Sequence, residues 1–581
     1  MCGICGELNF KGQAADLTAI EKMMKQLVRR GPDHGGSFSE GALAFGHRRL
    51  SIIDLSSKAH QPMIDSNLGL SMVFNGTIYN YKTLRNELKK LGYNFFSEGD
   101  TEVILKSFHH WGTNCVEKLH GMFAFAIWNH QTQQLFLARD RFGIKPLYFS
   151  QNSQRIRFAS TIQALISSGD INTQLDPIAL HYHLTLHAIP APHSLLQGIQ
   201  KVAPASWILF ERDGKYKKEV YWHLNAKRPE KPLKDQQWLD LTRETLKQAV
   251  ESHKLAADVP VGILLSGGVD SSLLTAMLAN ENLSTFSIGF EDTDQEKGNE
   301  FDYSDLVAKH CKTRHHRLLI PNHEVLARLP DAVAAMNEPM ISHDVVAFYL
   351  LSDYVSQHVK VVLGGQGADE VFGGYLYHQK MYQHNAFEPF YFDRDHAEFL
   401  ETVSPAFHGE NYSRQLVEEN LRLPNADEFI DQALRFDITT LLVDDPVKRV
   451  DNMTMAWGLE SRVPFLDHQL VELAAQMPPS FKMKDNGKYP LKALARELLP
   501  SQVIDRPKGY FPMPALRYVK GEFEHFMREI LYSDTCRNRN LFQRTYIDKL
   551  FNNPDSRFSP LMSNKLWHLA SLELWLQLLK I

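Results

Sequence analysis

A short segment rich in glycine and serine constrains the fold of this chain more than any other feature. It reads Ser-Gly-Gly-Val-Asp-Ser-Ser at residues 266–272, and it stands between an apolar run at 261–265 and a helix expected at 272–279. Glycines allow the backbone to approach an oxyanion closely, and the N–H groups of the turn and helix N-terminus then point at a phosphate. An acid, Asp270, fits such a turn when Mg²⁺ bridges pyrophosphate oxygens. The segment therefore predicts a phosphate-binding loop at the end of a strand.

The surrounding sequence predicts the sheet to which this strand belongs. A helical pattern at 238–253 precedes it, and further apolar strands are expected at 284–290 and 359–363. Apolar strands that alternate with helices are typical of a doubly wound parallel sheet, so we expect an α/β fold here. Beyond about residue 411 the pattern is mostly helical.

A second glycine-rich segment, residues 364–375, follows the strand expected at 359–363. Ligands of an open parallel sheet lie beyond the carboxyl ends of its strands, so this loop and the loop at 266–272 should share one crevice. Asp270 and Asp369 would then both hold Mg²⁺. The chain lacks the G-x-x-x-x-G-K-[ST] pattern, so transfer of a γ-phosphoryl group is not the expected chemistry.

The first 150 residues have a different pattern, with short strands expected at 43–47, 70–74, 123–128 and 134–139. Cys2 follows Met1 directly, and removal of Met1 would give Cys2 a free α-amino group. Such a group has a pKa near ~8, so one residue would supply both a nucleophilic thiol and its base. The five cysteines are too few and too scattered for a disulfide framework, and the Cys2–Cys5 pair has no second pair to complete a zinc site.

Length and charge limit the organisation and the partners. A chain of 581 residues should contain two or more domains. Its formal charge of −5 gives no basic excess for nucleic acid, and no apolar run approaches the ~20 residues of a membrane span. The N-terminus lacks the pattern of a secretion signal. We therefore expect a cytoplasmic protein with small-molecule partners, no nucleic acid and no membrane, and a homodimer is left open.

Proline and charge are enriched between about residues 185 and 234, which indicates a boundary. We expect a first domain at 1–190, a linker region at 191–234 and a second domain at 235–581.

Compact polar clusters in the first domain resemble one known family. They occupy residues 30–33, 47–54, 74–80, 99–102 and 139–148. Together with Cys2 they resemble the glutaminase half of the asparagine-synthetase-type, class II glutamine amidotransferases. That resemblance implies an αββα sandwich of the N-terminal-nucleophile type.

The resemblance assigns a role to each matching residue. Cys2 would attack the side-chain amide of glutamine, while Asn75 and the backbone of Gly76 would form the oxyanion hole. Arg49 would bind the α-carboxylate of glutamine, and Asp100 its α-ammonium. The family usually has glutamate where this chain has Thr77, so Thr77 would take part in glutamine binding without a carboxylate.

The second domain resembles the synthetase half of the same family, through the segment 266–272 and the segments 451–467 and 491–497. The pattern S-G-G-x-D-S is the signature of ATP pyrophosphatases, which adenylylate a carbonyl oxygen. The resemblance makes Lys492 the lysine that stabilises charge during catalysis. The residues expected to bind ATP are Leu265, Ser266, Gly267, Gly268, Asp270, Ser271, Ser272, Ile288, Gly364 and Gly365.

The implied reaction is amidation of a carboxylate, with Mg-ATP forming an acyl-adenylate and an internal tunnel delivering ammonia from glutamine. The acceptor is where the chain departs from asparagine synthetases, which usually have Ser-Gly-Glu-Gly at positions 364–367. Gln366 can form hydrogen bonds there but cannot act as a base. The loop of Gln366, together with the segments 299–304 and 337–349, resembles the branch of the family that amidates N-acetylglutaminylglutamine to make an osmolyte. Amidation of aspartate is the alternative acceptor hypothesis.

Three further hypotheses belong to other classes. A non-catalytic sensor of glutamine or nucleotide would not need an intact Cys2. A β-lactam-forming relative would have no use for a working glutaminase, and a nucleic-acid-modifying pyrophosphatase would need a basic surface.

Overall fold

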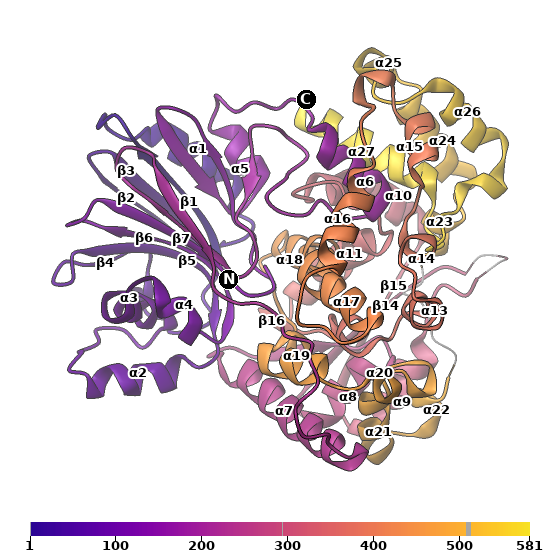
Figure 1. Ribbon diagram of the computed structural model, residues 1–581, viewed down its shortest axis with the longest axis horizontal. Helices are drawn as coiled ribbons and strands as arrows, with labels where there is room; N and C mark the ends of the chain where they lie inside the picture. Colours follow the sequence, from indigo (N-terminus) through magenta and orange to yellow (C-terminus); the bar gives the residue numbers. More distant parts are fainter. Residues whose placement is uncertain (1, 293, 295, 507–512) are drawn as a thin grey trace.

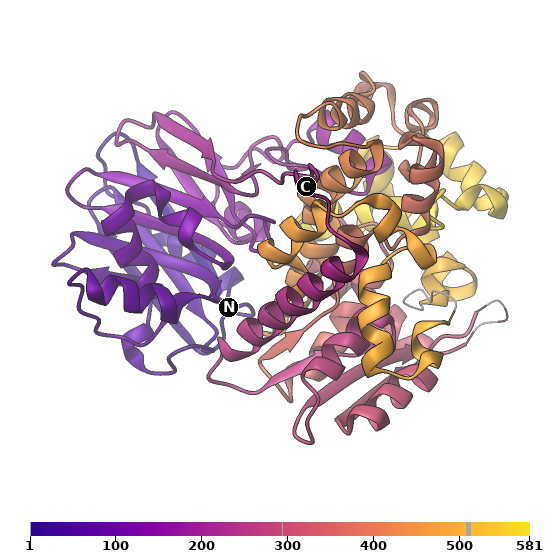
Figure 2. The same cartoon turned by 60° about the horizontal axis from the view of Figure 1, so that its bottom comes forward.

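The computed structural model describes residues 2–292, 294, 296–506 and 513–581, and it contains two domains that lie side by side (Figure 1). Met1, which would have to be removed to expose the α-amino group of Cys2, lies outside the described residues. The first domain is built mainly of strands, and the second surrounds a parallel sheet with helices. The long magenta helix in the middle of Figure 2, α7 (Asp235–Leu255), is the first helix of the second domain.

Two six-stranded sheets form the first domain. The order in one is β10-β8-β9-β1-β3-β2, and the order in the other is β12-β11-β7-β6-β5-β4. The first sheet contains β1 (Cys2–Asn9), β2 (His34–Glu40), β3 (Leu43–Arg49), β8 (Tyr148–Gln151), β9 (Arg155–Ala159) and β10 (Gln200–Lys201). The second contains β4 (Met63–Asp65), β5 (Leu70–Ile78), β6 (Gly121–Asn129), β7 (Gln134–Arg139), β11 (Ser206–Phe210) and β12 (Tyr216–Val220).

The sheets pack face to face because alternate side chains on each are apolar. Ile4 and Phe45 of one sheet and Val73 and Ala124 of the other lie in a common buried core. Helices α1 (Leu17–Gln26) and α5 (Ile162–Ser167) cover the outer face of the first sheet, and α2 (Tyr81–Lys90) and α3 (Asp100–Trp111) cover that of the second (Figure 1). The αββα sandwich expected from the sequence is confirmed.

The structure corrects the extent of the linker expected at residues 191–234. Strands β10, β11 and β12 lie within that range and belong to the two sheets of the sandwich. Trp207 and Phe210 of β11 are both buried, because this strand pairs with β7: Phe210 faces the core between the sheets, and Trp207 packs beside Phe136 on the outer face. Proline and charge mark the loops around these strands, which made the whole stretch resemble a connection. The connection proper therefore begins after β12 and ends at α7.

The second domain contains a five-stranded sheet in which every strand pairs with its neighbours in parallel. Within β16, Val361 and Leu363 lie in one buried core and Val362 lies in another, so both faces of the sheet are covered. Its order is β15 (Arg314–Ile320), β14 (Ser284–Phe290), β13 (Val261–Leu264), β16 (Val361–Leu363) and β17 (Glu460–Arg462).

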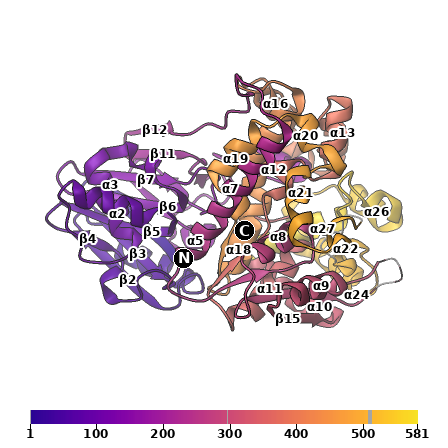
Figure 3. The same cartoon turned by 90° about the horizontal axis from the view of Figure 1, so that it is seen from below.

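Helices α7, α8 (Val269–Met277) and α21 (Tyr489–Leu498) pack together on one face of this sheet, and Figure 3 shows them close to one another. Helices α11 (Asp344–Ser356) and α18 (Lys448–Met455) pack on the other face. The doubly wound arrangement expected from the sequence is thus confirmed. In the part of the chain that the structure describes, no helix is both long and apolar enough to span a membrane.

Candidate active sites

Cys2 is the first residue of β1, and the pairing of β1 with β3 places it opposite Arg49. The backbone N–H of Cys2 donates to Asn75 Oδ1 at 3.0 Å. Cys2 is buried at the end of a small cavity, and Arg49, Thr77 and Asp100 are among the other residues that line it. The residues expected to hydrolyse glutamine therefore gather at one place, although they come from four separate segments of the chain.

A hydrogen-bond donor without a partner lies beside Cys2. Asn75 Nδ2 is buried and has no acceptor among the described residues. The next residue, Gly76, also lines the cavity, and a Cβ at this position would lie only 2.2 Å from the Met122 carbonyl oxygen. A buried donor that the fold leaves unsatisfied is costly, and it fits a site where a negative oxygen develops only during a reaction.

Arg49 and Asp100 are both held by backbone groups. Arg49 donates to the carbonyl oxygens of Ser56 at 3.0 Å and Ile53 at 3.3 Å, which fixes its guanidinium at the rim of the cavity. Asp100 begins α3, and its Oδ2 accepts from the Ile78 N–H at 3.0 Å. A cation and a carboxylate at separate positions suit the two charged groups of a free amino acid.

Burial changes the protonation of these groups. Burial raises the pKa of the Cys2 thiol, although the Leu50 N–H and the Arg49 guanidinium act in the opposite direction. Burial also raises the pKa of Asp100 to about 6, against the Ile78 N–H, which favours the ionised form. The thiol therefore needs a base to become a nucleophile near neutral pH.

Thr77 contacts the second domain. Its Oγ1 donates to Glu460 Oε1 at 3.1 Å and to Oε2 at 3.4 Å. Glu460 in turn accepts from Arg462 Nε at 2.5 Å. All three side chains are buried, so the domain boundary passes directly behind the cavity.

The segment 266–272 forms the turn after β13 and the first turn of α8, which begins at Val269, three residues before the helix start expected from the sequence. Ser266 Oγ and Ser271 Oγ lie 3.1 Å apart, and the Gly268 N–H donates to Ser266 Oγ at 3.3 Å. A larger cavity lies beyond the carboxyl ends of the central strands, at the place that the parallel sheet predicts. Seven of the residues expected at this site line it: Leu265, Ser266, Asp270, Ser271, Ile288, Gly365 and Gln366. Asp369 lines it as well.

Four residues expected to bind ATP do not line this cavity: Gly267, Gly268, Ser272 and Gly364. Ser272 is fully buried inside α8. The Gly364 N–H donates to the Arg462 carbonyl oxygen at 2.9 Å, which continues the pairing of β16 with β17. The Gly364 N–H therefore serves the fold in this structure, whereas Ser272 Oγ is buried without a hydrogen-bond partner among the described residues.

A lysine joins the two carboxylates expected to hold Mg²⁺. Lys488 Nζ lies 2.6 Å from Asp270 Oδ2 and 2.8 Å from Asp369 Oδ1. Burial on its own would lower the pKa of Lys488, but the two carboxylates more than reverse this and raise it. Gly374 leaves the space for this arrangement, because a Cβ there would lie 2.0 Å from Lys488 Cε and 2.2 Å from Asp369 Oδ1.

The position expected for Lys492 is corrected by this geometry. Lys492 Nζ donates to the Asp485 carbonyl oxygen, and Lys492 is not among the residues that line the cavity. The chain turns sharply before α21, and Lys488 has φ +56°, in the left-handed region. Lys488 does not line the cavity either, but its Nζ contacts Asp270 and Asp369, which do, whereas Lys492 lies one helical turn further along α21.

The two segments that depart from an aspartate pocket both reach the cavity. Glu300 and Ser304 come from the segment 299–304, and Asp344 and Phe348 come from the segment 337–349. Gln366 lines the same wall, and its Oε1 is buried without a hydrogen-bond partner among the described residues. An amide oxygen left in this state is suited to accept from a bound ligand.

Several residues of this cavity had no motif that singled them out. Arg506 forms two hydrogen bonds of 3.1 Å with Glu300, and Arg449 lies 3.5 Å from Asp344. Glu370 accepts from Tyr375 Oη at 2.8 Å, and burial raises the pKa of its carboxyl. The segment 364–375 contains both Glu370 and Tyr375, but only the fold shows which of its polar side chains face inward.

A buried ion pair connects the two domains near Cys2. Arg30 donates to Asp451 at 2.9 and 3.3 Å, and Lys145 donates to the same carboxylate at 3.2 Å. Arg30 Nε also donates to the carbonyl oxygen of Cys2 at 3.3 Å. The backbone of the nucleophile is thus tied to α18 of the second domain through one arginine.

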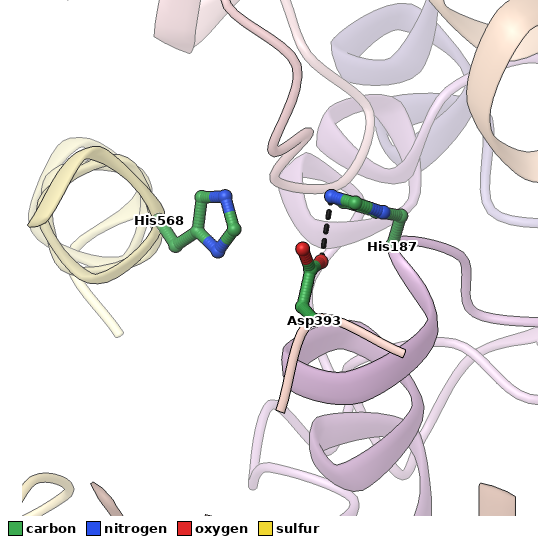
Figure 4. Close-up of side chains that lie close together, drawn as sticks. All are labelled: His187, Asp393 and His568. Atoms are coloured by element: carbon green, nitrogen blue, oxygen red, sulfur yellow. Dashed lines mark ion pairs between the residues drawn. The ribbon is translucent and has the colours of Figure 1, made fainter. Parts of the chain in front are cut away.

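One cluster outside both cavities has side chains that metals use. His187 Nε2 lies 2.6 Å from Asp393 Oδ2, and His568 lies opposite this pair (Figure 4). Arg394 Nη1 lies 3.3 Å from His568 Nδ1, where a guanidinium can only donate. The lone pair of His568 Nδ1 therefore faces a guanidinium, and we interpret this cluster as a buried ion pair of His187 and Asp393 with His568 of α27 (Lys565–Leu579) beside it.

Comparisons with known proteins match both domains of the chain. The family model described as asparagine synthase matches residues 241–577, and the model of the glutamine amidotransferase domain matches residues 1–222. The glutamine-hydrolysing asparagine synthetase 1 of Bacillus subtilis (strain 168) is 32% identical over 579 residues, which cover 91% of this chain and 90% of that protein. Asparagine synthetase 3 of the same organism is 29% identical and covers 100% of this chain and 99% of its own.

Asparagine synthetase B of Escherichia coli (strain K12) is 28% identical over 88% of this chain and 82% of its own. The matches therefore run through both domains, in the order that the structure has them. The chain belongs to the glutamine-hydrolysing asparagine synthetase family and is a glutamine-hydrolysing, amide-forming ligase of that family.

Proposed function

We propose that this enzyme forms an acyl-adenylate of a carboxylate with ATP and converts it to an amide with ammonia released at Cys2. One observation supports the first half most strongly. The loop of Ser266, the loop of Gly365 and the carboxylates of Asp270 and Asp369 surround one cavity at the carboxyl ends of a parallel sheet. This is the place and the donor set that a nucleotide with its pyrophosphate requires.

In the first domain, Cys2 attacks the side-chain amide of glutamine. Asn75 Nδ2 and the Gly76 N–H receive the oxyanion, Arg49 binds the α-carboxylate, and Thr77 and Asp100 bind the α-ammonium. The base is the α-amino group that removal of Met1 would give Cys2. The unsatisfied Asn75 Nδ2 supports this assignment, because an oxyanion would supply the acceptor that it lacks.

In the second domain, Asp270 and Asp369 would hold Mg²⁺, since the two carboxylates converge on one point, at Lys488 Nζ, and offer the oxygen ligands that this ion prefers. When bound, Mg²⁺ neutralises charge on the pyrophosphate that leaves. Lys488 lies between the same carboxylates and stabilises negative charge on the adenylate and on the intermediate that ammonia forms with it. The loops of Ser266 and Gly365 position the phosphates.

For the acceptor we propose N-acetylglutaminylglutamine. The amide of Gln366 supports this, because its buried Oε1 is suited to accept from a ligand that carries amides of its own. Glu300 and Asp344 are each next to an arginine, Arg506 and Arg449, so neither is left to bind the ammonium of an amino-acid acceptor. Aspartate is the second candidate, which the names of the curated relatives favour.

Release of pyrophosphate from Mg-ATP with glutamine present tests both acceptors. We expect release with N-acetylglutaminylglutamine and none with aspartate. Release with aspartate alone would make the enzyme an asparagine synthetase, and the proposed acceptor would be wrong. Release of glutamate from glutamine, lost in Cys2→Ala, separates an enzyme of either kind from a sensor that binds without turnover.

A further inference from the structure

The hydroxyl of Thr77 lies between the glutaminase cavity and a carboxylate of the other domain. Thr77 lines the cavity with Cys2, while its Oγ1 donates to Glu460 at 3.1 Å. A hydroxyl has one proton and two lone pairs. Because the proton is directed to Glu460 and Arg462 Nη2 donates to the same oxygen at 3.5 Å, one lone pair remains for a molecule in the cavity. In this arrangement Thr77 is an acceptor and not a donor.

Glu460 is held so firmly that this polarity is fixed. Arg462 donates to it through Nε at 2.5 Å, and the remaining nitrogens of Arg462 donate to the carbonyl oxygens of His253 and Ala256. Burial on its own would raise the pKa of Glu460, but Arg462 and Lys145 reverse this and lower it to about 2. Glu460 is therefore ionised, immobile and able only to accept.

The geometry points to a role for this pair in glutamine recognition. We propose that Glu460, from the synthetase domain, positions the hydroxyl of Thr77 as an acceptor for the α-ammonium of glutamine, so that Thr77 and Asp100 bind this group together. The proposal rests on the proposed function of the cavity. Glu460 acts through Thr77 and does not line the cavity itself, so it is a positioning residue. The glutamine site is then completed only when both domains are in place.

A substitution of Glu460 should remove the acceptor that Thr77 offers. In Glu460→Gln, an amide oxygen in the place of Oε1 still accepts from Arg462 Nε, and the amide nitrogen takes the place of Oε2, which lies 3.4 Å from Thr77 Oγ1. This nitrogen donates to Thr77 Oγ1, and Arg462 Nη2 already donates to the same oxygen at 3.5 Å, so no lone pair remains for the ammonium. Thr77→Val removes the acceptor without changing a charge.

The experiment measures glutamate release from glutamine in the full-length enzyme and, in parallel, hydrolysis of 4-carbamoylbutanoate, which lacks the amino group. We expect Thr77→Val and Glu460→Gln each to raise KM for glutamine about tenfold or more, the range of a hydrogen bond to a charged group, with a smaller change in kcat. KM for 4-carbamoylbutanoate should not change. The double variant should be no worse than either single variant, because both remove one interaction.

Two further variants make the result specific. Thr77→Glu combined with Glu460→Gln places a carboxylate directly in the cavity and should restore KM for glutamine. Glu472→Gln is the matched control. Like Glu460, Glu472 is a carboxylate of the second domain that accepts a hydrogen bond from an earlier part of the chain, here from Trp222 Nε1 at 2.6 Å, and neither residue lines this cavity. This control should leave both KM values unchanged. Ammonia-dependent pyrophosphate release shows that each variant is folded.

An unchanged KM for glutamine in Glu460→Gln would overturn the proposal, as would equal increases in KM for glutamine and 4-carbamoylbutanoate. The second result would mean that Glu460 only maintains the shape of the cavity. If the unmodified enzyme does not release glutamate from glutamine at all, the proposed function of the cavity fails first, so the two failures are distinguishable.

Discussion

Lys488 Nζ lies 2.6 Å from Asp270 Oδ2, and this contact joins two segments that are 218 residues apart in the sequence. Asp270 lies in the first turn of α8, whereas Lys488 precedes α21. The packing of α21 against α8 brings the two together, so the nucleotide loop and the lysine are positioned by the same pair of helices. Asp369 is the second carboxylate at this lysine.

The first prediction separates the two lysines. Lys488→Ala should reduce ATP-dependent amide formation by about 10²–10³, the cost of removing one preorganised charge from a transition state. Lys492→Ala should remain within about threefold of the unmodified enzyme, because Lys492 contacts the Asp485 carbonyl oxygen and not the cavity. Pyrophosphate release measures both, and glutamate release at Cys2 serves as the control for folding. A large loss in Lys492→Ala with normal activity in Lys488→Ala would reverse the assignment.

The second prediction concerns the unsatisfied donor beside Cys2. Asn75→Ala should lower kcat for glutamine hydrolysis by about 10²–10³ and leave KM nearly unchanged, because the oxyanion forms only during the reaction. The synthetase reaction driven by added ammonium chloride should be unaffected. The assignment of Asn75 to the oxyanion hole would be wrong if KM rose and kcat did not fall.

The sequence predicted the two sites unequally well, for a physical reason. Cys2 and Arg49 could be predicted because short local motifs mark them. The structure adds that the pairing of β1 with β3 places the two residues opposite each other. The same holds for the loop at 266–272, where local glycines and serines carry the signal. Lys488 was missed because its position depends on a left-handed turn before α21, and Lys492 matched the helical pattern better.

The contact between Glu460 and Thr77 could not be predicted from the local sequence either. These two residues are 383 positions apart, and each fits a structural role in its own segment. Strands β10, β11 and β12 show the same limit, since their loops contain the proline and charge that usually mark a linker. Long-range packing, and not local propensity, decides such cases.

The third prediction is a pH dependence set by Asp100. Burial raises its pKa to about 6, so the carboxylate that binds the α-ammonium is ionised above that pH and protonated below it. The α-amino base lowers kcat/KM for glutamine below pH ~8, and we expect Asp100 to add a second fall of about tenfold for each unit of pH below its own midpoint. Asp100→Asn should have a lower kcat/KM and lose this second fall. A midpoint near pH 4 in the unmodified enzyme would show that the carboxyl of Asp100 is not shifted in this way.

The last prediction concerns the buried carboxylate that ties the domains together. Burial on its own would raise the pKa of Asp451, but Arg30 and Lys145 lower it, so Asp451 stabilises the fold above the ordinary pKa of an aspartate and loses this contribution as the pH falls through the lowered value. Asp451→Asn leaves two buried cations without their counter-charge, which should lower the free energy of unfolding by about 3–5 kcal/mol at neutral pH. Chemical denaturation followed by fluorescence measures this loss.

Because Arg30 also holds the carbonyl oxygen of Cys2, Asp451→Asn should loosen the passage of ammonia between the sites as well. The number of amide molecules formed per glutamate released should fall, while ammonia-driven synthesis changes less. Asp33→Asn is the control, because Asp33 forms a partly exposed interdomain pair with Lys360 at 2.8 Å, and such a pair contributes only about 0–1 kcal/mol. If the two substitutions had equal effects on stability and on the amide-to-glutamate ratio, burial of the Asp451 ion pair would not matter. The link from Asp451 to Cys2 through Arg30 would then have no function.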